Sequence, residues 1–492
     1  MRALARPLRT AVVTVSFLLA YAVTAAHAGT GETPAIAWAP CPEDKVVQCG
    51  TMTVPADWAD PFGPTTTLTV ARRPATDPDR RIGALLVNPG GPGGSAVDFT
   101  FGAGTFFGAE LRKRFDIVGM DPRGVGRSSP VLCSRDLVDA KPNPLIASEQ
   151  AYIDMIAYNR RLAADCARRT GPVFGHVDTA SVVRDMDAVR KALGEEKISF
   201  YGASYGSLMG QQYAEMFPDR LRALVLDGVM DHSANLASFL IHETDAAQDS
   251  FREFVAWCAR DTKCVLRGRD ITALWATLMT RARAGTLEHP YDRPAKLTPA
   301  DLIGAAFAAF YDPQWYSFAY YLRDAAGIAP AGRSAPPIPV DIIDHSFPAV
   351  ICADWYLPIV GFADLRRRLR ILAARAPQML VSPLALNALT GCLGWPAAPA
   401  NPQRPTVPPP GLPPVVLIGA EHDPATAYVW AQQVAKRFGA GGALITYQGW
   451  GHVVYNQSPC VAALADKYLI TLIPPAAGSS CPAIEPEPFG VG

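Results

Sequence analysis

Residues 198–207 read ISFYGASYGS. The first four are typical of a short strand buried on both faces, and a helical pattern continues from 207 to 216. Between the two, Ser204 stands in a G-x-S-x-G pattern, which places a serine on a sharp strand-to-helix turn with its hydroxyl exposed at the end of a sheet. The pattern alone also fits an ordinary Gly-Ser turn, but its position between a strand and a helix favours a nucleophile. We therefore interpret Ser204 as the candidate nucleophile.

Apolar runs of similar length lie on both sides of this segment. They cover residues 84–87, 115–120, 223–226, 415–418 and 443–446. Residues 182–193 carry apolar side chains at helical spacing between two of these runs. Such alternation predicts the α/β class, with a mostly parallel central sheet covered by helices.

A serine hydroxyl is a weak nucleophile near neutral pH and needs a neighbouring base. In sheets of this kind the partners follow later strands, in the order serine, acid, histidine. Asp423 comes just after the run 415–418, and His452 comes just after 443–446. We therefore predict a triad of Ser204, Asp423 and His452. Other titratable residues remain open as alternatives for the acid and the base: Glu421, His422 and Asp227.

Acyl-transfer chemistry also needs hydrogen-bond donors for an oxyanion. We expect one donor to be the backbone N–H of Tyr205, which follows the candidate nucleophile. Residues 88–94 read NPGGPGG directly after an early strand, and there Gly91 is the expected second donor, with Gly90 as the alternative. A second Gly-rich loop, DPRGVGRS at 121–128, has the spacing of neither a P-loop nor a dinucleotide fingerprint, and we interpret it as a support for the oxyanion side.

The length of 492 residues exceeds what one hydrophobic core usually holds. Composition divides the mature chain into four segments. These are an N-terminal part of an α/β core (29–230), a helical, aromatic-rich cap insertion (231–395), a Pro-rich connector (396–414) and the C-terminal part of the core (415–492). The aromatic residues of the cap fit an ordinary core as well as a cover over a site.

The first residues have the pattern of an export signal. Arg2, Arg6 and Arg9 precede an apolar run at 11–23, and Ala-His-Ala at 26–28 is a small-x-small cleavage site. A membrane anchor is the alternative, but the run is shorter than the ~20 apolar residues that a spanning helix needs. We predict a signal peptide at 1–28 and a secreted protein with no stable membrane association.

The ten cysteines agree with an oxidising compartment, because their number is even and none forms a C-x-x-C pair. Free thiols in a cytosolic enzyme are the alternative. Pairing neighbours in the chain closes the shortest loops. This gives Cys41–Cys49, Cys133–Cys166, Cys258–Cys264, Cys352–Cys392 and Cys460–Cys481.

Charge gives no reason to expect a nucleic-acid or anionic-membrane partner, since Lys plus Arg and Asp plus Glu both number 45. No motif implies a metal or an organic cofactor. We expect a monomer.

The chain resembles the secreted tripeptidyl aminopeptidases of actinomycetes, relatives of the proline iminopeptidases. The resemblance spans most of the chain, and its most specific parts are the two Gly-rich loops. It rests on residues 88–95, 121–128, 202–206, 423–424, 451–452 and 351–354, and on Cys41 and Cys49.

The resemblance implies an α/β-hydrolase fold with a helical cap, and removal of short peptides from a substrate with a free N-terminus. An enzyme of this kind needs a carboxylate for the substrate's ammonium group, because an unpaired buried charge is costly. Asp354 and Glu243 are the candidates, each with a structural role as the alternative. A carboxylesterase or lipase-like enzyme with the same triad, and a binding module without activity, are the competing hypotheses.

Overall fold

The computed structural model describes residues 36–292, 294–327 and 342–488. The predicted signal peptide at 1–28 lies outside these ranges. The strands are β1 (Ala39–Pro40), β2 (Gln48–Pro55), β3 (Thr65–Arg73), β4 (Gly83–Asn88), β5 (Phe115–Met120), β6 (Leu132–Ser134), β7 (Ile198–Ala203), β8 (Leu221–Asp227), β9 (Ile342–Asp344), β10 (Val415–His422), β11 (Gly442–Trp450) and β12 (Ser480–Pro482). The α-helices are α1 (Ala96–Phe106), α2 (Ala109–Arg114), α3 (Arg135–Asp139), α4 (Glu149–Thr170), α5 (Thr179–Ala192), α6 (Tyr205–Met216), α7 (Leu236–Arg260), α8 (Ile271–Arg283), α9 (Pro299–Tyr311), α10 (Trp315–Ala325), α11 (Ser346–Asp354), α12 (Gly361–Arg375), α13 (Pro383–Gly391), α14 (Tyr428–Phe438) and α15 (Pro459–Thr471).

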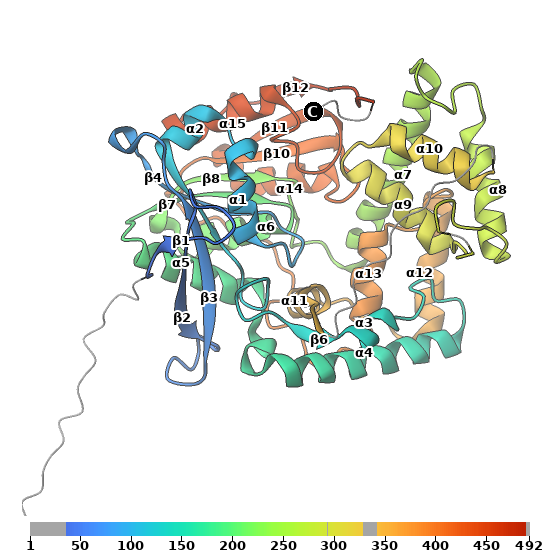
Figure 1. The fold of residues 1–492 in the computed structure, drawn as a ribbon, viewed down its shortest axis with the longest axis horizontal. Helices are drawn as coiled ribbons and strands as arrows, with labels where there is room; N and C mark the ends of the chain where they lie inside the picture. Colours follow the sequence, from blue (N-terminus) through green and yellow to red (C-terminus); the bar gives the residue numbers. More distant parts are fainter. Residues whose placement is uncertain (1–35, 293, 328–341, 489–492) are drawn as a thin grey trace, which may run out of the picture. The chain divides into compact units, whose positions relative to one another are not determined.

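A mixed sheet organises these elements, in the order β1-β2-β3-β5-β4-β7-β8-β10-β11-β12 (Figure 1). The pairs β1–β2, β2–β3 and β3–β5 are antiparallel. All later neighbours, from β5–β4 to β11–β12, are parallel. The expected mostly parallel sheet is therefore present, with an antiparallel extension at its N-terminal edge.

Helices cover both faces of the central parallel strands, which explains why β4, β5, β7, β8 and β10 are almost fully buried. On one face, Leu86 and Phe200 share a buried cluster with side chains of α5, α6 and α14. On the other face, Leu85 and Tyr201 share a cluster with side chains of α1, α2 and α15. Because neighbouring residues of a strand point to opposite faces, each of these five central strands contributes to both clusters.

The strand order reverses at β4. The chain continues from β4 to β5 on one side, whereas β7 pairs with the other side of β4. In parallel sheets, the loops that leave such a reversal point diverge and open a crevice at the carboxyl ends of the strands. Residues 88–95 and Ser204 follow the two strands that meet there.

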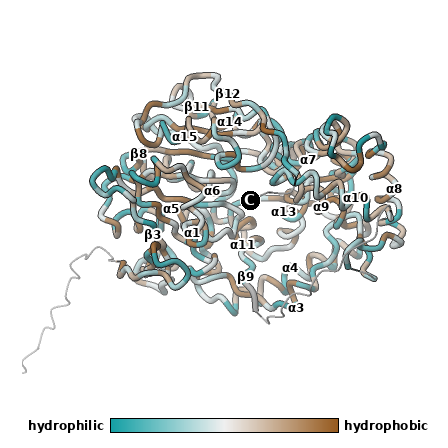
Figure 2. Tube along the Cα trace, turned by 45° about the horizontal axis from the view of Figure 1, so that its top comes forward, coloured by the Kyte–Doolittle hydropathy of each residue, from teal (hydrophilic) through white to brown (hydrophobic). Residues whose placement is uncertain are grey.

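Part of the helical region between β8 and β10 has a core of its own, whereas α11, α12 and α13 contribute to the buried cluster of the sheet. Residues of α7, α8, α9 and α10 form one buried cluster that is rich in aromatic rings, including Phe254, Trp257 and Trp315. Figure 2 shows apolar and polar stretches alternating along these helices. Among the described residues of this region, the secondary structure is helical apart from the short strand β9, and its role as a cap stays a prediction.

Two elements from the N-terminal part of the chain join this helical region. Asn159 of α4 donates hydrogen bonds to the carbonyl oxygens of Thr390 (2.7 Å) and Leu393 (2.8 Å). The strand β6 pairs with β9 in an antiparallel ladder, and α4 lies beside α12 (Figure 1). These elements therefore pack against the helical region across position 230, where the predicted domain boundary stays a prediction.

The Pro-rich segment 396–414 has no regular secondary structure but is tied to its surroundings by side chains. Asn401 donates to Asp354 (2.7 Å), and Thr406 donates to Gln211 of α6 (3.2 Å). Arg404 forms an ion pair with Glu215 at 2.8 Å. These contacts fix the connector along α6.

All ten cysteines are paired, and none is free. Each disulfide joins two cysteines that are neighbours in the chain: Cys41–Cys49, Cys133–Cys166, Cys258–Cys264, Cys352–Cys392 and Cys460–Cys481. Within the described ranges, no helix has both the length and the apolar character needed to cross a membrane.

Candidate active site

Ser204 occupies a strained turn between β7 and α6. Its backbone angles are φ 55° and ψ −123°, a conformation that costs free energy in any residue with a Cβ. A Cβ atom on Gly202 would lie 2.3 Å from the carbonyl oxygen of Gly206, so the turn requires the glycine of the sequence pattern. The turn places Ser204 at the N-terminus of α6, where unpaired N–H groups favour negative charge.

Asp423 and His452 form a buried pair. The Nδ1 atom of His452 lies 2.9 Å from Oδ2 and 3.0 Å from Oδ1 of Asp423, and both side chains are 1% exposed. The N–H groups of Ala425 (2.8 Å) and Thr426 (2.9 Å) donate to Oδ1 of the same carboxylate. The Thr426 hydroxyl donates to Oδ2 at 2.7 Å. These donors fix the carboxylate so that it can orient the imidazole.

The second imidazole nitrogen, Nε2 of His452, is buried and has no hydrogen-bond partner in the described part of the chain. Because Nδ1 faces a carboxylate, the Nδ1–H tautomer is favoured and Nε2 carries the lone pair. A buried nitrogen in that state is a proton acceptor available to a substrate or a hydroxyl group.

Tyr311, at the end of α9, contacts both Ser204 and His452 and was not singled out in the sequence. The His452 N–H donates to the Tyr311 carbonyl oxygen at 2.8 Å, and the two ring centroids are 4.5 Å apart. The pKa of the Tyr311 hydroxyl is raised above its usual range, mainly by burial and also by the Asp423 charge. A hydrogen bond with Ser204 opposes this increase in part. One tyrosine thus contacts both Ser204 and His452, whose action in one site stays a prediction. No local motif marks Tyr311, which ends an ordinary apolar helix.

The Gly-rich loop after β4 lies directly against the Ser204 turn. A Cβ atom on Gly90 would lie 2.5 Å from the Ala203 carbonyl oxygen, 2.7 Å from Cβ of Ser204 and 2.8 Å from the Tyr205 nitrogen. The Gly90 N–H already donates to Asn88 Oδ1 at 2.9 Å. Of the two glycines considered from the sequence, Gly91 is therefore the better candidate donor.

The second Gly-rich loop, residues 121–128, is hydrogen-bonded to the chain just after the first, residues 88–94. Asp121 accepts hydrogen bonds from the Ser95 hydroxyl (2.7 Å) and the Val97 N–H (2.9 Å) through one oxygen, and from the Arg127 N–H (2.8 Å) through the other. Arg123 forms a fully buried ion pair with Asp185 at 2.6 Å. These contacts agree with the interpretation of residues 121–128 as a structural support.

The alternatives for acid and base have other partners. His422 bonds Asp249, with 2.7 Å between Nδ1 and Oδ2, and Glu421 is exposed. Asp227 accepts from the Tyr201 hydroxyl (2.9 Å) and from the N–H groups of Val454 (3.1 Å) and Tyr455 (2.9 Å). Burial raises the pKa of Asp227 to about 6, although these hydrogen bonds lower it.

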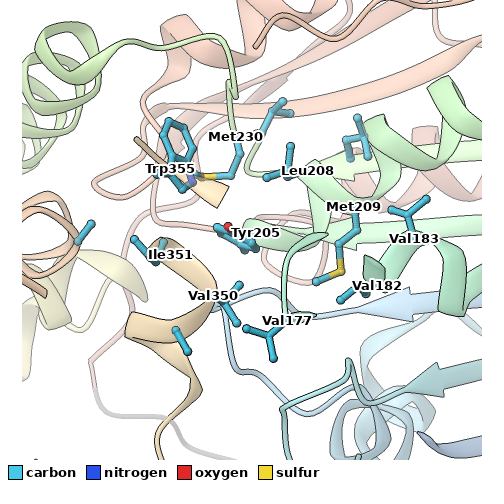
Figure 3. Packing of buried hydrophobic residues seen from close by; sticks show 14 of the residues in the cluster. Val177, Val182, Val183, Tyr205, Leu208, Met209, Met230, Val350, Ile351 and Trp355 are labelled. Carbon is cyan, nitrogen blue, oxygen red and sulfur yellow. The ribbon is translucent and has the colours of Figure 1, made fainter. Parts of the chain in front are cut away.

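The structure corrects the expectation that Asp354 binds the substrate's ammonium group. Asp354 is fully buried and accepts from the Thr179 N–H (2.9 Å), the Thr179 hydroxyl (2.6 Å), the Tyr205 hydroxyl (2.6 Å) and Asn401 (2.7 Å). Figure 3 shows the Tyr205 side chain among Val350, Ile351 and Met230, within the core. With its oxygens occupied by internal donors, Asp354 joins α11 to the nucleophile helix.

Glu243, the other carboxyl considered for the ammonium group, is also fully buried. Ser382 donates to its Oε2 at 2.9 Å, and Oε1 has no partner among the described residues. Burial raises the pKa of Glu243 well above its usual range, and the Asp423 charge adds to this effect. A substrate-binding role for Glu243 stays a prediction.

A parallel sheet, a serine on a strained strand-to-helix turn and a buried Asp–His pair after later strands define a class of enzyme. A family model described as the alpha/beta hydrolase fold matches residues 83–459. The chain belongs to the α/β-hydrolase family, and the predicted fold is confirmed.

Named relatives sharpen this assignment. The chain is 30% identical to the serine protease Hip1 of Mycobacterium tuberculosis, over 91% of each chain. It is 31% identical to the tripeptidyl aminopeptidase of Streptomyces coelicolor, over 92% of this chain and 85% of the relative. It is also 32% identical to carboxylesterase B of Mycobacterium tuberculosis, over 96% of this chain and 97% of the relative. The predicted resemblance to the tripeptidyl aminopeptidases is confirmed.

Proposed function

We propose that this protein is an exported serine peptidase that releases short peptides from free N-termini through an acyl-enzyme. The observation that carries the proposal is the buried pair of Asp423 and His452. The Nε2 atom of His452 has no partner among the described residues, and Tyr311 contacts both His452 and Ser204. The similarity to two named peptidases supports the choice of peptides as substrates. The disulfides support a working place outside the reducing cytosol.

In this proposal His452 accepts the proton of Ser204 at Nε2 while the serine oxygen attacks the scissile carbonyl carbon. Asp423 orients the imidazole and stabilises its cation. The N–H groups of Tyr205 and Gly91 bind the oxyanion, and losing one such donor typically costs about 3 kcal/mol of transition-state stabilisation. His452 then donates its proton to the leaving amine, and a water molecule hydrolyses the acyl-enzyme by the same route.

The first test is Ser204→Ala, with Ser199→Ala at the other end of β7 as the matched control. Ser204→Ala should abolish turnover and labelling by a fluorophosphonate probe, because the attacking oxygen is lost. Ser199→Ala should keep both. Turnover by the folded Ser204→Ala protein would refute the scheme.

The second test separates a peptidase from an esterase. The esterase is the alternative because the chain is similar to carboxylesterase B. Free and N-acetylated tripeptide anilides are compared with short p-nitrophenyl esters on the wild-type enzyme. A clear preference for the free-amine peptide supports the proposal. Hydrolysis of the esters alone would assign the protein to the carboxylesterases.

A further inference from the structure

The geometry points to the pair Asp227–Gly228, at the end of β8, as the positioning element that holds His452 in register with Ser204 and Asp423. The inference rests on the proposed triad and adds residues that do not themselves touch the reacting atoms. Three contacts carry it, one to each of the loops that follow β7, β11 and β10.

The first contact is made by the main chain. Asp227 lies opposite Ala203 in the parallel β7–β8 pair. One residue further, the Ser204 N–H donates to the Asp227 carbonyl oxygen at 2.7 Å. The nucleophile turn is thus tied to the end of β8 by backbone atoms.

The second contact is made by the Asp227 carboxylate with the loop that follows His452. Its Oδ1 accepts from the Val454 N–H at 3.1 Å, and its Oδ2 accepts from the Tyr455 N–H at 2.9 Å. These two donors directly follow Val453, a β-branched residue with a φ of 60°. That left-handed conformation is a steric outlier for valine and persists only where the surroundings impose it. The carboxylate therefore fixes the strained turn that aims the imidazole.

The third contact involves Gly228, which has a φ of 64°. A Cβ atom there would lie 2.9 Å from Cε1 and 3.2 Å from Nδ1 of His452, and 3.1 Å from the Thr426 hydroxyl oxygen. The Gly228 N–H donates to the Ile418 carbonyl oxygen at 3.1 Å, on the strand that leads to Asp423. Gly228 thus gives the imidazole the space to lie against the backbone while its own N–H fixes the acid's strand.

Asp227 is a positioning residue in this view and not the acid of the triad. Its carboxylate accepts from two backbone N–H groups and the Tyr201 hydroxyl, whereas both Asp423 oxygens lie within 3.0 Å of His452 Nδ1. An amide at position 227 would point an N–H₂ group at a backbone donor. The Val453 turn would then relax and move the imidazole.

The experiment compares Asp227→Asn with Asp466→Asn. Asp466 is a half-buried residue whose carboxylate accepts a hydrogen bond from the Tyr455 hydroxyl at 2.5 Å. In Asp227→Asn, kcat should fall about 100-fold for peptide and ester substrates alike, since a displacement near 1 Å has an effect of that order. KM should change by no more than about threefold, because the substrate contacts remain. Asp466→Asn should keep the wild-type kcat.

A rescue distinguishes positioning from a general effect on the fold. Val453→Gly, introduced into Asp227→Asn, removes the steric cost of the left-handed turn and should recover about tenfold in kcat. An undiminished kcat in Asp227→Asn, a loss confined to KM, or no recovery in the double variant would each overturn the inference. If Asp227→Asn does not fold, Gly228→Ala replaces it as the test. Full turnover by Gly228→Ala would overturn the inference, and so would its failure to fold.

The outcome is separable from that of the proposed function. Turnover by Ser204→Ala refutes the triad, whatever Asp227→Asn does. An inactive Ser204→Ala beside a fully active Asp227→Asn refutes only the positioning role. An active Asp423→Asn beside an inactive Asp227→Asn would make Asp227 the acid and would also overturn the inference.

Discussion

The strand ends and the helical core of α7 to α10 are held together in different ways. At the strand ends, main-chain groups make the connections, as when the Gly228 N–H donates to Ile418 at 3.1 Å. In the helical core, aromatic rings pack on one another, and the Phe254 centroid lies 4.9 Å from that of Phe318 and 6.1 Å from that of Trp315. Hydrogen bonds fix direction, whereas apolar burial supplies stability without direction. We therefore expect substitutions at the strand ends to affect turnover first and substitutions in the helical core to affect stability first.

The largest effect is expected for Asp423→Asn. The amide can donate to Nδ1 and so favours the wrong imidazole tautomer, and kcat should fall by about 10⁴-fold with little change in the unfolding midpoint. The matched control is Asp249→Asn, which alters the Asp–His pair at His422 and should keep the wild-type kcat. Steady-state kinetics with a free tripeptide anilide checks both, and equal losses in the two variants would contradict the assignment of the acid.

Phe254→Ala tests the helical core. Phe254 is fully buried, and its truncation should lower the free energy of unfolding by about 3–5 kcal/mol, as is usual for a phenylalanine removed from a core. Phe62→Ala is the matched control, because Phe62 is 99% exposed. Urea unfolding measures both. A large loss of kcat in folded Phe254→Ala, without loss of stability, would contradict the expectation that the helical core affects stability first.

His232, just beyond the end of β8, gives a pH-dependent test of stability. Its Nε2 lies 2.8 Å from the Asp354 carbonyl oxygen, and burial lowers its pKa to about 4, although this hydrogen bond raises it. Between about pH 6.5 and 4 the unfolded chain binds a proton that the folded chain excludes. The free energy of unfolding should therefore fall as the pH falls, by up to about 3 kcal/mol from this residue.

His232→Gln keeps a donor for the Asp354 carbonyl but has no titratable group. Urea unfolding of both proteins at pH 6.5, 5 and 4 should show a smaller loss in the variant as the pH falls. Parallel curves for the two proteins would rule out this contribution from His232.

The smallest of these effects is expected for Gly90→Ala. The new methyl group meets the backbone of the Ser204 turn, and the backbone adopts φ 90° at this position. A shift of the oxyanion loop should lower kcat by about 100-fold. Gly102→Ala is the matched control, because within the described residues no atom beyond its chain neighbours and its own helix backbone lies within 4 Å of the new methyl group. Equal kcat in the two variants would show that the loop does not act on the site.

Much of this architecture was predictable because it is encoded in local patterns. Apolar runs predicted the buried strands. The G-x-S-x-G pattern predicted the turn at Ser204, because the turn leaves room only for glycine at the neighbouring positions. Asp423 and His452 could be proposed for the triad because each comes just after a strand, and parallel strands bring their carboxyl ends to one edge. The neighbouring cysteines pair as the shortest loops suggest.

The remaining features depend on contacts between distant segments, which no local pattern reports. Whether a buried carboxylate faces a substrate or is occupied by internal donors depends on what packs around it, and this decided against Asp354. Tyr311 reaches the site because α9 packs where it does, and α4 joins the helical region for the same reason. The sequence by itself determined the class of fold, because strand periodicity and turn chemistry are local, and it supplied the prediction of the triad. Only the tertiary structure decided which donors fill each carboxylate and which side chains surround the imidazole, because these depend on packing across the whole chain.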